Sequence, residues 1–260
     1  MAAGDATARM HAPVVRDDGV PDRVAVEEPL EIRAGGQALA VTMRTPGHDE
    51  ELAVGFLHGE GLLAGPVASV GPTPDLAANI VEVDAPLRAG ARERRFYTTS
   101  SCGICGRGAL DEVAVHASPL PDGPVVDRAL LARLPDQLRQ PAFELTGGMH
   151  ATGLFDATGA LLCVREDVGR HNAMDKVIGR ALLDGRLPLH DRILCVSGRL
   201  SFELVQKAAV AGCPILVGVG APSSLAVELA ADRGMTLGGF ARGGNVNIYA
   251  GAGRVTAAGT

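Results

Sequence analysis

The stretch NAMDKVIGRALLDG, residues 172–185, decides the fold of the second half of the chain. Its apolar residues follow the spacing i, i+3, i+4, i+7, i+8, which is the period of an amphipathic helix. They are Met174, Val177, Ile178, Ala181 and Leu182. Asn172 is predicted to cap the start of this helix, and Gly185 suits the left-handed position that follows a helix end.

Strands and helices alternate on both sides of this helix. We expect a helix at 127–140, strands at 150–156 and 160–166, a strand at 193–197, a helix at 201–211, a buried strand at 214–219, a helix at 224–233, and strands at 235–240 and 245–249. Strands separated by helices of this length are joined by right-handed parallel crossovers. The pattern predicts an α/β protein whose residues 125–250 form a three-layer α/β/α domain.

The first half of the chain predicts a smaller β-rich region at 21–98, after a disordered tail at 1–20. Alternating apolar residues flank Gly35-Gly36, which indicates a hairpin of two antiparallel strands. A helix is expected at 48–63, and strands at 79–83 and 94–98. Residues 99–124, rich in glycine and then proline, are predicted to be a mobile loop and connector, and residues 251–260 a second tail.

Composition excludes some classes of function. The chain has 260 residues with a formal net charge of −6 at pH 7 and a pI of about 5.6. A protein that coats nucleic acid through bulk positive charge is therefore excluded, and we expect no nucleic-acid partner. No apolar run approaches the roughly 18 residues that span a bilayer, so no membrane segment is expected. The start of the chain lacks the pattern of a signal peptide. Five cysteines do not form a secreted disulfide framework, and a cytoplasmic location is predicted.

Cys102 and Cys105 form a CxxC motif in a segment rich in glycine. A structural zinc ion would need a second ligand pair, and the sequence has no second CxxC, so no metal site is expected. A redox pair would need the first cysteine at a helix start, which the neighbouring glycines disfavour. Covalent carriage of sulfur as a persulfide, or two unreactive surface cysteines, remain as alternatives. The other cysteines, Cys163, Cys195 and Cys213, lie in or beside apolar strands and are predicted to be structural.

Three strand-to-helix turns carry polar residues that suit an anionic ligand. In an open α/β sheet, ligands gather beyond the carboxyl ends of the strands and at helix N-termini. The candidates are Arg170, His171, Asn172, Ser197 and Arg199, with Ser201 and Ser223 at the starts of later helices. For any one turn alone, an ordinary helix cap is the better explanation of the polar residue. Because three such turns occur together, we favour a phosphate-binding crevice.

Five motifs together resemble the formate dehydrogenase accessory sulfurtransferases, the FdhD family. They are Ser101-Cys102-Gly103-Ile104-Cys105-Gly106, Thr146-Gly147-Gly148-Met149-His150, the run 166–176 (EDVGRHNAMDK), Ser197-Gly198-Arg199 and Gly238-Gly239-Phe240-Ala241-Arg242. They occur in the family order, and the resemblance runs from about residue 22 to residue 250.

The resemblance implies that the protein takes sulfur from a cysteine desulfurase. It would pass that sulfur to a molybdenum cofactor with two molybdopterin guanine dinucleotides, which formate dehydrogenase requires. Cys102 would carry the persulfide, and Cys105 matches the second cysteine of the motif. The cofactor-contacting stretch corresponds to Phe240, Ala241, Arg242, Gly243, Gly244 and Asn245, with the crevice residues as neighbours of the dinucleotide. A guanine nucleotide is expected to mimic the cofactor, and a homodimer is expected.

The resemblance also implies a fold similar to cytidine deaminases for the second half, which raises deamination as a rival activity. A zinc deaminase needs His-x-Glu at one helix start and Pro-Cys-x-x-Cys at the next. Here His171 is followed by Asn172 and Ala173, and the next helix opens with Ser201-Phe202-Glu203. The sequence therefore argues against deamination. A chaperone that binds the cofactor without moving sulfur remains the main alternative.

Overall fold

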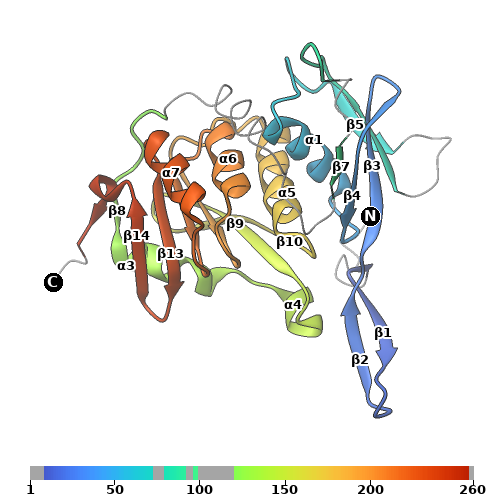
Figure 1. The fold of residues 1–260 in the computed structure, drawn as a ribbon, viewed down its shortest axis with the longest axis horizontal. Coiled ribbons are helices and arrows are strands. Elements are labelled where there is room, and N and C mark those ends of the chain that lie inside the picture. Colours follow the sequence, from blue (N-terminus) through green and yellow to red (C-terminus); the bar gives the residue numbers. More distant parts are fainter. Residues whose placement is uncertain (1–8, 73–78, 92–95, 99–119, 258–260) are drawn as a thin grey trace.

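Two β-sheets lie on either side of a pair of crossing helices, α1 (Asp49–Gly59) and α5 (Arg170–Leu183) (Figure 1). The structure is a computed structural model, and it describes residues 9–72, 79–91, 96–98 and 120–257. Helix α1 packs on the sheet built from the first half of the chain. Helix α5 packs on the sheet built from the second half. The protein is therefore of the mixed α/β class that the sequence predicts.

The sheet of the second half has six strands in the order β10-β9-β11-β12-β13-β14. Their bounds are β9 His150–Asp156, β10 Leu161–Asp167, β11 Arg192–Val196, β12 Ile215–Gly218, β13 Thr236–Arg242 and β14 Asn245–Ala250. The central strands β11, β12 and β13 run parallel, whereas the pairs β9–β10, β9–β11 and β13–β14 are antiparallel. Every residue of β12 is buried, as expected for a parallel strand covered on both faces.

Helices cover both faces of this sheet. One face packs against α5, α6 (Phe202–Val210) and α7 (Ser224–Asp232), whose buried side chains form one apolar cluster. The other face packs against α3 (Arg128–Arg133) and the short 3-10 helix η2 (Leu134–Gln137) in a second cluster. The sequence predicts one helix over 127–140. It divides because Pro135 has no N–H to donate within a regular helix. The expected likeness to cytidine deaminases stays a prediction.

The sheet of the first half has five strands in the order β5-β6-β3-β4-β7. Their bounds are β3 Glu28–Ala34, β4 Gln37–Arg44, β5 Ser69–Pro72, β6 Ile80–Asp84 and β7 Phe96–Thr98. The predicted hairpin joins β3 and β4, and Gly35 and Gly36 both adopt positive φ in its turn. Helix α1 ends at Gly59, earlier than the expected residue 63, and Gly61 follows in the left-handed region.

Two glycines let α1 and α5 approach backbone to backbone. A Cβ atom at Gly55 would stand 1.9 Å from the carbonyl oxygen of Asp175, and one at Gly179 would stand 1.8 Å from that of Glu51. No side chain fits at either position. Beside this contact, the carboxylate of Glu51 accepts hydrogen bonds from Nε and Nη2 of Arg165 at 2.6 and 2.8 Å. The two halves of the molecule therefore meet at an interface that combines close backbone packing of α1 and α5 with a polar contact between Glu51 and Arg165.

The ends of the described chain are more ordered than the sequence predicts. Residues 11–15, expected within a disordered tail, form β1 (His11–Val15), which pairs with β2 (Pro21–Ala25) in a ribbon that extends from the body (Figure 1). At the other end, the expected tail contains η3 (Ala252–Arg254) and β15 (Val255–Thr256), which pairs with β8 (Val126–Asp127). A short helix, α4 (Pro141–Thr146), was also not expected. The predicted division into domains stays a prediction.

Candidate functional site

Three turns meet at the carboxyl edge of the parallel strands. They are the β10–α5, β11–α6 and β12–α7 connections, each of which leads into the first turn of a helix. Backbone hydrogen bonds join the last two: Gly220 donates to the carbonyl of Gly198, Leu200 to that of Ala221, and Ser223 to that of Leu200, at 3.0 Å each. The predicted convergence of these turns is therefore observed.

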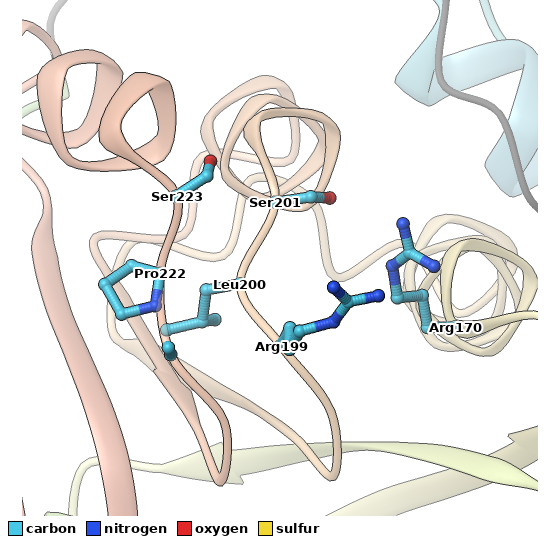
Figure 2. A pocket seen from close by; sticks show the side chains of 7 residues that line it. Arg170, Arg199, Leu200, Ser201, Pro222 and Ser223 are labelled. Carbon is cyan, nitrogen blue, oxygen red and sulfur yellow. The ribbon is translucent and has the colours of Figure 1, made fainter.

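A pocket of about 230 Å³ opens at this edge. Its lining residues are Arg170, Arg199, Leu200, Ser201, Ala221, Pro222 and Ser223. Figure 2 shows the side chain of Arg199 extending toward Arg170, with the hydroxyl-bearing Ser201 and Ser223 at the starts of α6 and α7. The pocket therefore presents two positive charges together with helix N-termini, whose dipoles also favour an anion.

The positive charges of this pocket are only partly balanced by the described residues, because Glu203 interacts electrostatically with Arg170 but forms no ion pair with it. Nε of Arg170 is buried and makes no hydrogen bond. Among the residues that the structure describes, no carboxylate pairs with the guanidinium of Arg170 or Arg199. A buried polar group without a partner costs free energy, so native proteins keep few of them. An anion between the two guanidinium groups would satisfy both.

The serines at the helix starts play different roles. Ser223 is an ordinary N-cap, because its Oγ accepts a hydrogen bond from Ala226 N at 3.3 Å. Ser201 makes no cap hydrogen bond, and its Oγ instead lies 3.2 Å from Nε2 of His171. The N-terminal N–H groups of α6 are therefore not satisfied by their own cap residue. Ordinary capping explains the polar residue of one turn but not of the other.

His171 and His150 are held in the neutral form near these arginines. Burial lowers the pKa of His171 to about 4, and the charges of Arg170 and Lys207 act in the same direction. Burial also lowers the pKa of His150, helped by Arg170 and Arg199. Oε2 of Glu203 lies 3.7 Å from Nε2 of His171 and opposes the shift. Around neutral pH, the site therefore carries the positive charge of its arginines and not of its imidazoles.

Asn172 does not line the pocket, and its predicted place beside the dinucleotide stays a prediction. It lies in the first turn of α5, whose N-cap is Gly169, so it is not the cap residue. Its Nδ2 donates to the carbonyl of Met43 at 2.7 Å and to Asp167 Oδ1 at 3.1 Å. This buried side chain joins the two halves of the molecule. The composition of the turn, rich in polar residues, does not distinguish such a structural role from ligand binding.

A buried ion pair fixes the start of α5. Nζ of Lys176 lies 2.7 Å from Asp167 Oδ2 and donates to the carbonyl of Thr45 at 2.9 Å. The carboxylate of Asp167 also accepts hydrogen bonds from the backbone N–H groups of Gly169 and Thr45. This network orients the first turn of α5, which carries Arg170. Sequence reasoning missed it, because no local pattern links Thr45 to residues over 120 positions away.

Ser197 and His150 lie just behind the turn that carries Arg199. Oγ of Ser197 accepts a hydrogen bond from Ala151 N at 2.9 Å, so it extends the seam between β9 and β11. The ring of His150 faces Gly198, because a Cβ atom there would stand 3.3 Å from Nδ1 of the histidine. Ser197 is therefore a structural neighbour of the pocket and not part of its lining.

The predicted stretch from Phe240 to Asn245 covers the end of β13 and the turn into β14. Phe240 adopts a left-handed backbone conformation with φ 53°, and 38% of the residue is exposed. Its N–H donates to the carbonyl of Gly220, which places it beside the pocket. Ala241 is fully buried and presents no side chain to a ligand. Arg242, Gly243, Gly244 and Asn245 are exposed.

The predicted catalytic residues Cys102 and Cys105 lie outside the described residues. Of the other cysteines, Cys195 and Cys213 are buried and Cys163 is half-buried. Burial raises the pKa of all three thiols, that of Cys213 to about 12, so they are poor nucleophiles, as a structural role requires.

The described residues contain no group of three or more metal-ligating side chains. They also contain no helix long and apolar enough to cross a bilayer.

Comparisons with known proteins agree with the motifs. A model of the FdhD/NarQ family matches residues 25–256. The sulfur carrier protein FdhD of Streptomyces coelicolor is 52% identical over 97% of this chain and 96% of its own length. That of Mycobacterium tuberculosis is 48% identical over 91% of this chain and 92% of its own.

A solved structure is similar as well. It is the crystal structure of a putative formate dehydrogenase accessory protein from Desulfotalea psychrophila. It superposes with a TM-score of 0.73 and 28% identity, covering 95% of this chain and 97% of the other.

Proposed function

Because this chain belongs to the FdhD/NarQ family, we propose that it is a sulfur carrier. It accepts sulfur from a cysteine desulfurase and delivers it to the molybdenum cofactor with two pterin guanine dinucleotides that formate dehydrogenase requires. The name of its relatives supports sulfur carriage. The donor, the cofactor and the dehydrogenase come from the resemblance of the motifs. The function has two parts, since the protein must hold the cofactor and must transfer sulfur.

The guanidinium groups of Arg170 and Arg199 support the first part of the proposal, that the protein holds the cofactor. Arg170 and Arg199 line one pocket and form no ion pair with a carboxylate among the described residues. The two phosphates of a guanine dinucleotide supply the negative charge that these groups lack. A volume of about 230 Å³ is below the roughly 300–1,000 Å³ of a typical whole-ligand pocket. The pocket therefore suits the diphosphate, and the base and pterin rings would lie outside it.

Phe240 supports a binding surface for one of those rings. Its left-handed backbone is unusual for a bulky residue, and such strain collects at functional sites. The hydrogen bond from its N–H to the carbonyl of Gly220 holds its backbone beside the pocket, and the residue is partly exposed. An aromatic face favours stacking with a planar heterocycle. Arg242 and Asn245, exposed in the next turn, are available for polar contacts to the same ligand.

The second part of the proposal assigns sulfur transfer to Cys102 and Cys105. The thiolate of Cys102 attacks the terminal sulfur of a persulfide on the desulfurase. A new S–S bond forms on Cys102, and the desulfurase cysteine leaves as a thiolate, so no external oxidant is needed. In one route for release, the thiolate of Cys105 attacks the inner sulfur of Cys102. The terminal sulfur then leaves as sulfide, and a disulfide remains.

Intact mass spectrometry tests the carrier. The protein is incubated with a cysteine desulfurase and L-cysteine and is then weighed with and without a reductant. The wild-type chain should gain the mass of one sulfur atom, and reductant should remove it. Cys102→Ala should gain none, whereas Cys163→Ala should gain sulfur as the wild type does, because the half-buried Cys163 is a poor nucleophile. A reducible adduct on Cys102→Ala would contradict the assignment.

A cofactor chaperone that moves no sulfur is the competing function. The double variant Cys102→Ala/Cys105→Ala separates the two, because it removes the carrier chemistry and leaves the described pocket unchanged. We expect this variant to leave formate dehydrogenase inactive. Full activity of the dehydrogenase would replace the carrier by a chaperone. The expected homodimer is a separate prediction, which sedimentation analysis of the purified protein checks.

A further inference from the structure

His150 is a titratable side chain that does not line the pocket but lies beside the turn that carries Arg199, and the proposed function gives it no role. It opens β9, and its ring lies on the β11–α6 turn that carries Arg199. A Cβ atom at Gly198 would stand 3.3 Å from Nδ1 and 3.5 Å from Cε1 of His150. The glycine therefore provides the surface on which the ring rests. The backbone of that turn holds the imidazole next to the residue that bears one of the two guanidinium groups.

The charges around His150 come from three elements. Arg170 of α5 and Arg199 of the β11–α6 turn oppose its protonation, and Asp167 of β10 favours it. Asp167 is already committed, because it pairs with Lys176 and accepts three further hydrogen bonds. His171, also on α5, interacts with His150 and is itself neutral, flanked by Glu203 and Lys207 of α6. The local excess charge is therefore positive.

An anion in the pocket would reverse this balance. It would neutralise the two guanidinium charges that disfavour a third positive charge, and it would add negative charge at short range. Burial and these arginines lower the pKa of His150 in the free protein, so the ring can accept a proton around neutral pH. The pKa of His171 should rise less on anion binding, because Ser201 and Glu203 already lie close to its Nε2.

We infer that His150 is a third cationic group of the phosphate site, and that it takes up a proton when a diphosphate binds between Arg170 and Arg199. This inference rests on the proposed function, because it assigns a role within the same pocket. The proton comes from solvent and is held on the imidazole while the ligand is bound. Binding should therefore strengthen as the pH falls from 8 to 6, by at most about tenfold per pH unit for one proton.

Isothermal titration calorimetry on the full chain tests the inference. The probe is P1,P2-di(guanosine-5′) pyrophosphate, a diester whose two phosphates keep one charge each over this pH range. Titrations at one pH near neutrality, in two non-phosphate buffers with different enthalpies of ionisation, give the number of protons taken up. The wild-type protein should take up a fraction of one proton, and its affinity should rise between pH 8 and pH 6.

His150→Gln should bind the probe more weakly, with no proton uptake and no pH dependence between pH 6 and 8. His190→Gln, at an exposed histidine, is the matched control and should behave as the wild type. Binding by the wild type without proton uptake overturns the inference, as does uptake that persists in His150→Gln. The first of these results needs no folded variant. Absence of any binding would instead overturn the proposed function, and the inference with it.

Discussion

The charged side chains on the two sides of the first turns of α5 differ in whether they are paired within the described chain. On the side that faces the first half of the molecule, Lys176 lies 2.7 Å from Asp167 and also donates to Thr45. On the side that faces the pocket, Nε of Arg170 is buried without a hydrogen bond, and Arg199 extends toward it. The buried charge on the first side is neutralised by an ion pair, whereas the guanidinium on the second side has no ion pair among the described residues.

This difference separates structural charge from ligand-binding charge. Burying an ionised group costs several kcal/mol unless a partner and hydrogen bonds compensate it. Asp167 receives that compensation from Lys176 and from the chain itself, so the pair fixes the position of α5. Among the described residues, Arg170 has no ion pair, and only the nearby charge of Glu203 acts on it. Under the proposed function, a bound anion supplies the missing compensation. The comparison yields predictions, given below from the largest expected effect to the smallest.

Lys176→Met should have the largest effect, because it leaves Asp167 buried without its counter-charge. We expect the free energy of unfolding to fall by about 3–5 kcal/mol, measured by urea denaturation. Arg186→Met, at a cation whose side chain is 53% exposed, should change stability by no more than about 0.5 kcal/mol. A loss below about 1 kcal/mol for Lys176→Met would show that the ion pair does not organise this side of the helix.

Gly179→Ala should follow, since its Cβ would stand 1.8 Å from the carbonyl oxygen of Glu51 on α1. The helices must separate, and overpacking of this kind costs about 1–3 kcal/mol. Gly71→Ala is the control, because nothing lies within 4 Å of its added Cβ. Thermal unfolding monitored by circular dichroism compares the two variants. Equal melting temperatures would mean that the two halves are not in the close contact described.

Arg199→Gln should produce the opposite pattern to Lys176→Met. Stability should stay within about 0.5 kcal/mol of the wild type, because the residue is exposed and has no ion pair among the described residues to lose. Affinity for GDP should fall by about tenfold or more, since a charge-assisted contact to phosphate is lost. Calorimetry measures the affinity, with Arg186→Gln as the control. Undiminished binding would place the phosphates elsewhere.

The smallest effect distinguishes the two serines at the pocket. Ser223→Ala removes a cap hydrogen bond and should cost about 1 kcal/mol. Ser201→Ala removes no cap hydrogen bond and loses only the contact of its Oγ with Nε2 of the part-buried His171, so its cost in unfolding free energy should be smaller. Paired urea denaturation curves resolve this difference. Equal losses at both serines would contradict this difference in capping.

Much of this architecture is predictable from local patterns. The helix from residue 170 to residue 183 follows from its apolar period, and the buried strand β12 from its continuous apolar run. The convergence of the strand-to-helix turns follows from the parallel order of the strands, and it correctly brings Arg170 and Arg199 to one pocket. In each case the signal lies within a few residues of the feature it predicts.

The features that the sequence does not reveal depend on distant partners. Asn172 has the composition of a cap or a ligand-binding residue, but Met43 engages it from the other half of the molecule. β1 and β15 are too short to show a period, and each forms only because a partner strand lies beside it. The glycines inside α1 and α5 disfavour a helix by local propensity, and only the crossing of the two helices accounts for them.

That crossing also limits how the molecule can move. With carbonyl groups rather than side chains in the contact, α1 and α5 have no flexible layer between them that could absorb a rotation or a slide. A change of the interhelical angle would have to break this backbone contact. We therefore expect ligand binding to displace the turns at the strand ends and to leave the two sheets in the same relative position.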